Sequence, residues 1–64
     1  MIITLTDIDG IVFDVDTDYI ESVTRSSYTT IILKTGEKIK CRDKFITIAS
    51  AIVKGYFTKE NNYV

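Results

Sequence analysis

The sequence predicts an α+β fold: a curled five-stranded antiparallel β-meander with one C-terminal α-helix packed on it. Two observations predict it. Short stretches in which apolar and polar residues alternate fill the chain up to residue 42, and turn-forming residues separate them, which is typical of antiparallel strands. From residue 45 the apolar residues instead recur at helical spacing.

The clearest alternation is the predicted hairpin Thr29–Arg42. Ile31 and Leu33 before the turn, and Ile39 and Cys41 after it, lie on one face, because successive side chains of a strand point to opposite faces. Thr35-Gly36 supplies the turn, since glycine tolerates the positive φ of tight hairpins. The opposite face is cationic and is a candidate anion or nucleic-acid surface, formed by Lys34, Lys38, Lys40 and Arg42.

Two earlier strands are predicted over residues 2–6 and 11–15. Ile3 and Leu5 point inward from the first, and the second directs Ile11, Phe13 and Val15 inward. The segment Asp7–Gly10 between them is a turn, because Asp side chains bond nearby amides and glycine supplies free backbone geometry.

A third strand is predicted over residues 19–24, after turn formers at 16–18. Its two aliphatic residues, Ile20 and Val23, are three positions apart, which breaks the period of two. A β-bulge near Glu21-Ser22 would place both on the core side. Residues 25–28 form the next turn.

A helix is predicted over residues 44–57, with Asp43 positioned to bond its first free amides. Its inner row is Phe45, Ile48, Ala49, Ile52 and Tyr56. A second apolar row, Ile46, Val53 and Phe57, widens the apolar arc to about 180°, more than one sheet needs. We expect this outer row to meet another copy of the chain; the alternative is that the sheet curls and covers both rows.

Residues 1–57 form the single predicted domain, and residues 58–64 a flexible polar tail. A chain of 64 residues is marginally stable alone, and it has one cysteine and no histidine. Stabilisation by an internal disulfide or a zinc site is therefore excluded. Association into a homodimer or higher oligomer is the remaining means of stabilising so small a chain. The chain has neither a stretch apolar enough to span a membrane nor a signal-peptide pattern, so we expect a cytoplasmic protein.

Charge is divided unevenly although the net charge is −1. Residues 1–30 hold six acidic residues against Arg25, and residues 31–64 hold seven basic residues against three acidic ones. Two solvated surfaces of opposite sign explain this most simply, and the acidic half argues against a nucleic-acid partner.

Catalytic chemistry has little support in the sequence. Without histidine there is no imidazole base, and Cys41 falls on an inward position where a small buried residue is expected. The Asp14–Asp18 stretch reads D-x-D-x-D, but a calcium loop would need Gly and Glu where Tyr19 and Arg25 stand. We therefore expect no enzyme activity, no catalytic residues, no cofactor and no metal.

The chain resembles the small FlbD-like flagellar proteins, also called swarming motility protein SwrD, over about residues 1–45. The matching positions are Met1, Ile2, Leu5, Thr6 and Gly10, then Ile20, Glu21 and Val23, then Thr29, Ile31, Leu33 and Gly36. It departs from the family pattern at Cys41-Arg42-Asp43, where V-x-E is usual, and in a more apolar helix.

The resemblance implies a small non-catalytic protein-interaction module of the flagellar accessory type, with an unidentified protein partner. Two alternatives stay open. One is a phage or mobile-element accessory protein that binds a host factor or small ligand as an oligomer. The other is a nucleic-acid-binding module that uses the basic hairpin Thr29–Arg42.

Overall fold

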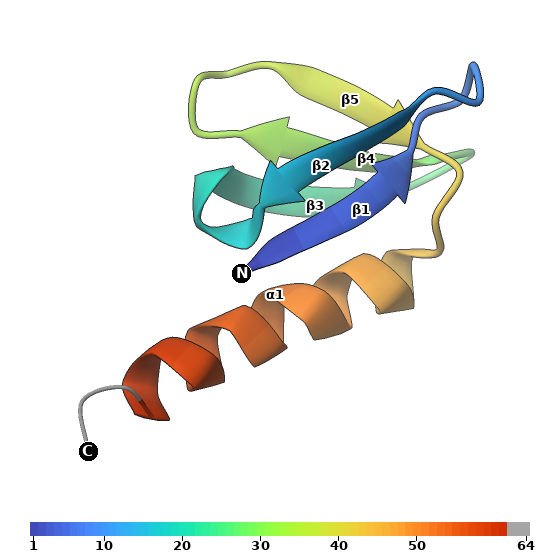
Figure 1. Cartoon of the computed structure of the whole chain (residues 1–64). Coiled ribbons are helices and arrows are strands. Elements are labelled where there is room, and N and C mark those ends of the chain that lie inside the picture. The colour runs from blue at the N-terminus through green and yellow to red at the C-terminus, as the bar shows by residue number, and fades with distance from the viewer. Residues whose placement is uncertain (62–64) are drawn as a thin grey trace.

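The computed structural model describes the chain over residues 1–61, with side chains over residues 1–55. It contains β1 (Ile2–Thr6), β2 (Val12–Asp16), a short 3-10 helix η1 (Thr17–Tyr19), β3 (Ile20–Arg25), β4 (Thr29–Leu33), β5 (Lys38–Cys41) and α1 (Phe45–Asn61). All the strands pair antiparallel, in one sheet of β1 and β2 and one of β3, β4 and β5 (Figure 1). The predicted α+β class is therefore confirmed.

The β1–β2 hairpin forms as the alternation predicts, with Leu5 opposite Phe13. Its turn is closed by the Asp7 carboxylate, which accepts the backbone N–H groups of Asp9 and Ile11 at 2.9 Å each. The prediction that Ile11 points inward is wrong, because its side chain is 62% exposed. Ile11 belongs to this turn, and β2 begins one residue later.

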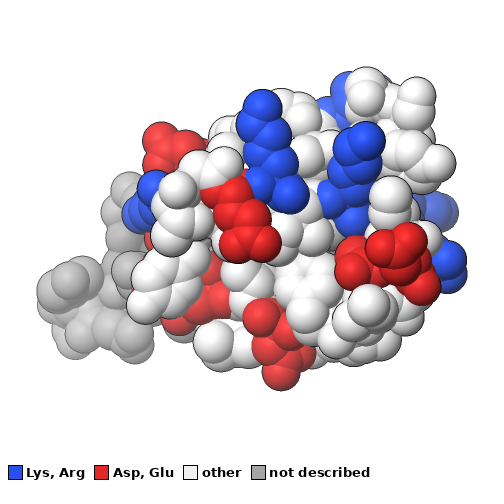
Figure 2. Space-filling view, turned by 90° about the horizontal axis from the view of Figure 1, so that it is seen from above, with Lys and Arg blue, Asp and Glu red and all other residues white. Residues whose placement is uncertain are grey.

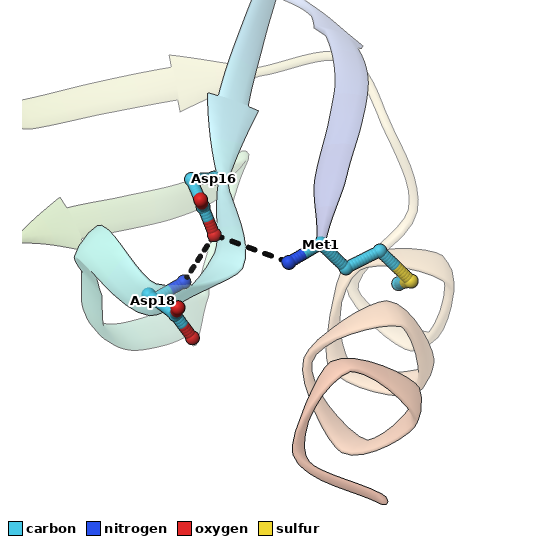
Figure 3. A network of polar contacts seen from close by, with 3 residues as sticks. All are labelled: Met1, Asp16 and Asp18. Carbon is cyan, nitrogen blue, oxygen red and sulfur yellow. Dashed lines mark hydrogen bonds and ion pairs between the residues drawn. The ribbon is translucent and has the colours of Figure 1, made fainter. Parts of the chain in front are cut away.

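The meander is interrupted between β2 and β3. The Asp16 carboxylate accepts the Asp18 N–H at 3.0 Å and the Met1 amino group at 3.2 Å (Figure 3). The Thr17 N–H also donates to the Met1 carbonyl at 2.9 Å. These bonds wind the turn formers at 16–18 into η1, so the strands divide into two sheets at this point.

The predicted β-bulge in the third strand is confirmed. Ile20 pairs with Leu33 and Ser22 with Ile32, so the register shifts between Ile20 and Ser22. The shift places Ile20 in the buried core and lets Val23 pack against it.

The two sheets meet along a seam between the end of β1 and the end of β5. An isolated bridge pairs Asp7 with Cys41, and the Arg42 N–H donates to the Thr6 carbonyl at 2.8 Å. Asp43 also contributes, since its carboxylate accepts the Thr6 N–H at 2.7 Å. The expected role of Asp43 as a helix cap is thus replaced by a bond that holds the first hairpin onto the second sheet.

The core lies between the sheets and α1, which runs beneath both (Figure 1). Its buried members are Leu5, Ile20, Ile31, Cys41 and Ile48. Ile52 packs against them from the next turn of the helix. Farther along α1, a Cβ at Gly55 would lie 2.6 Å from the Thr17 hydroxyl oxygen, so this glycine allows the helix to approach η1 closely.

Helix α1 continues beyond its predicted end at Phe57 and reaches Asn61. Residues 58–61, which were assigned to the tail, therefore continue the helix. Residues 62–64 of the predicted tail lie outside the described residues. Within the described part of the chain, no helix is long and apolar enough to cross a membrane.

Candidate functional site

All four predicted basic residues are exposed on the β4–β5 hairpin or directly after it. Lys38 and Lys40 alternate with inward residues along β5, and Lys34 directly follows β4. The Lys40 ammonium lies 5.9 Å from the centroid of the Tyr28 ring, close enough for a cation–π contact.

Arg42, the fourth member of the predicted set, is held by the protein itself. Its Nε and Nη2 atoms both donate to the Ile8 carbonyl, at 3.2 and 3.0 Å. This guanidinium group thus fastens the β1–β2 turn to the end of β5. Acidic and basic side chains also intermingle on the face seen in Figure 2, so that face is not one continuous basic surface.

The outer row of α1 lies open in the single chain. Ile46 is 66% exposed and Val53 is 52% exposed. The alternative in which the curled sheet covers both helical rows is therefore wrong for these two residues. The Phe57 side chain lies outside the described residues, and the covering of this row by a second copy stays a prediction.

A groove of about 550 Å³ lies between the β3–β4 turn and the beginning of α1. It is lined by the turn residues Arg25, Ser26, Ser27, Tyr28 and Thr29 and by the segment Cys41, Arg42, Asp43, Lys44, Phe45 and Ile46. The sequence did not reveal this groove, because its two walls are far apart in the chain. The sequence feature that could have indicated the groove is the presence of cationic and aromatic residues in both segments.

The charged groups of the groove differ in the contacts that they make within the protein. The Arg25 guanidinium carbon lies 5.8 Å from the centroid of the Phe45 ring. The Asp43 carboxylate is already bonded to the Thr6 N–H. Among the described residues, the lining therefore holds three cationic side chains and two aromatic rings against one carboxylate.

Cys41 is among the lining residues of this groove and is 1% exposed. Burial, followed by the negative charges of Asp43 and Asp7, raises the pKa of the Cys41 thiol to about 11. The thiol is consequently protonated at neutral pH, which makes it a poor nucleophile and a poor metal ligand. Within the described residues, no group of three or more His, Cys, Asp or Glu residues is placed to hold a metal ion.

Comparison with known proteins gives a family. No curated protein and no solved structure matches the chain. A family model described as FlbD, flagellar and swarming motility proteins, matches residues 1–58. This match reaches past the resemblance at residues 1–45 and includes β1 to β5, the seam and most of α1. The chain therefore belongs to the FlbD family of flagellar and swarming motility proteins.

Proposed function

We propose that this chain is a non-catalytic accessory protein that serves flagellar or swarming motility by binding other proteins, including a second copy of itself. The observation that carries the proposal is the exposed outer row of α1, in a helix whose other face fills the core. The family match supplies the motility setting.

Self-association through this row has a physical reason. Full burial of one aliphatic side chain of this size is worth about 1.5–3 kcal/mol. Ile46 and Val53 are seven residues apart, so they lie on one side of the helix two turns from each other. Figure 1 also shows α1 running past the ends of the strands. A small domain with a limited core gains most from such burial.

The first prediction concerns mass in solution. The wild-type chain should have the mass of a dimer or larger assembly by light scattering, and Val53→Asp should shift it toward the monomer, because an unpaired carboxylate would have to be buried. Thr47→Asp is the matched control: it adds the same charge at an exposed position about 120° round the helix from Val53 and should keep the assembly. A wild-type chain with a monomer mass at all concentrations would contradict self-association.

The motility role is tested in the organism that encodes the chain. Deletion of the gene should reduce swarming, and the wild-type gene should restore it. Val53→Asp should restore it less well than Thr47→Asp at equal protein levels. Normal swarming after deletion would contradict the motility role. If the two variants restored swarming equally, the outer row of α1 would not be needed for that role.

A further inference from the structure

We propose that the groove between the β3–β4 turn and the beginning of α1 binds a short acidic peptide segment of a partner protein, with an apolar side chain of that segment against Phe45. The inference rests on the proposed function and names the chemistry of the partner. It concerns a different surface from the outer row of α1, although Ile46 borders both.

Local charge favours an anionic occupant. Arg25 and Lys44 line opposite walls of the groove, and Lys40 lies beside it over Tyr28. Within the part of the chain that the structure describes, none of these three cations forms an ion pair. The one carboxylate of the lining, on Asp43, is bonded to the Thr6 N–H. The groove is thus locally positive although the whole chain carries a net charge of −1.

The beginning of α1 adds to this preference. The first turn of the helix contains no acidic residue, so the positive end of the helix dipole is not offset by a side chain of that turn. Phe45 and Ile46, the first two helical residues, lie in the groove wall. An acidic side chain in the groove would therefore be attracted by the helix end as well as by Arg25 and Lys44.

The apolar part of the wall favours a peptide over a phosphate-bearing ligand. Phe45, Tyr28 and Ile46 offer aromatic and aliphatic surface between the cations. Aromatic and arginine side chains of this kind dominate binding energy in protein interfaces. The volume of about 550 Å³ falls within the range of ligand-binding clefts.

A nucleic acid fits these features less well. Its binding relies on cations that follow successive phosphates along a strand. Arg42 lines the groove, but its Nε and Nη2 atoms already donate to the Ile8 carbonyl and are not free for a phosphate. The three cations of the lining, Arg25, Arg42 and Lys44, lie around one short groove rather than along a track.

The second prediction tests this groove by NMR titration of the whole chain. The probe is an acetylated, amidated hexapeptide in which phenylalanine and leucine are flanked by aspartate and glutamate; its control carries asparagine and glutamine instead. The acidic peptide should shift amide resonances of residues 26–29 and 43–46, and the neutral peptide should bind at least about fivefold more weakly.

Two double variants with the same change of charge complete the design. Arg25→Gln with Lys44→Gln should weaken binding of the acidic peptide at least about fivefold. Lys34→Gln with Lys54→Gln removes two exposed cations that do not line the groove, and should change the affinity less than about twofold. Equal losses in the two double variants would overturn the proposal, because they would indicate only a response to net charge.

Further outcomes separate this inference from the proposed function. Equal binding of the neutral peptide, or tighter binding of oligothymidylate in the same groove, overturns the acidic-peptide site. If no peptide binds while deletion still impairs swarming and Val53→Asp still lowers the mass, the groove proposal fails alone. If the peptide binds as expected while deletion leaves swarming normal, the motility proposal fails and the groove stands.

Discussion

Cys41 is the residue at which the two sheets, the groove and the core meet. It pairs with Asp7 across the seam, lines the groove and is among the most deeply buried side chains. The alternation of apolar and polar residues along β5 is enough to predict that Cys41 points inward. Two carboxyl-bearing neighbours, Asp7 and Asp43, then make its ionisation still less favourable than burial does.

The third prediction follows from this raised pKa. The pKa of the Cys41 thiol is about 11 in the folded chain, whereas a thiol exposed on unfolding has its ordinary pKa of 9.0. Between these values the native state binds more protons, so the free energy of unfolding should fall as pH rises, by on the order of 1 kcal/mol per pH unit.

Urea unfolding from pH 8 to 11 measures this slope, and Cys41→Ala, which has no titrating thiol, isolates the contribution of Cys41. The variant should lose stability less steeply than the wild type above pH 9. Parallel slopes in the two proteins would show that the thiol does not contribute.

At the scale of elements, the sequence predicted most where the signal is local. The spacing of Ile20 and Val23 indicated a bulge because only an extra residue lets both reach one face. The turn formers at 16–18 marked the break after β2, but not that the break would divide the strands into two sheets. Ile11 was misplaced because the alternation continues into a turn where no core lies opposite.

Features that depend on distant segments were not predictable in the same way. Asp43 has the position of a helix cap in the sequence, but the backbone of Thr6 comes within 2.7 Å of its carboxylate in the fold. The groove likewise needs the β3–β4 turn to lie beside the beginning of α1. Single-sequence patterns carry no information on such pairings unless a register or a disulfide fixes them.

The fourth prediction concerns the contact between α1 and η1. Replacing a helical glycine by alanine usually stabilises a protein by up to about 1 kcal/mol. At Gly55 the new Cβ would lie 2.6 Å from the Thr17 hydroxyl oxygen, so Gly55→Ala should instead destabilise by about 1–2 kcal/mol in urea unfolding.

Thr17→Ala provides the control, because it removes the clashing oxygen and leaves neighbours at 3.5 Å or more. In that background Gly55→Ala should be neutral or stabilising. The same destabilisation with and without the threonine would place the cost elsewhere than in the approach of α1 to η1.

At the scale of the whole molecule, the seam decides whether the two sheets act as one body. Only the Asp7–Cys41 bridge joins the sheets as a strand pair within the described residues. Bonds around it reinforce the joint: Ile8 N–H to the Lys40 carbonyl, Arg42 N–H to the Thr6 carbonyl, and the side chains of Arg42 and Asp43. Both Arg42 and Asp43 also border the groove, so loosening the seam should alter the groove as well.

The fifth prediction tests this joint. Asp43→Ala leaves the partly buried Thr6 N–H without its acceptor and should lower the free energy of unfolding by about 2 kcal/mol, since bonds to charged groups are worth about 1.5–3 kcal/mol. Hydrogen exchange should quicken first at the seam amides of Thr6, Ile8 and Arg42. Asp14→Ala is the matched control, because Asp14 accepts a bond from the Thr4 hydroxyl on the exposed face of the β1–β2 hairpin, away from the seam. If both variants quicken exchange at the same amides, the carboxylate of Asp43 does not hold the sheets together. If only Asp43→Ala does, this side chain, which also borders the groove, contributes to the union of the sheets alongside the backbone bonds of the seam.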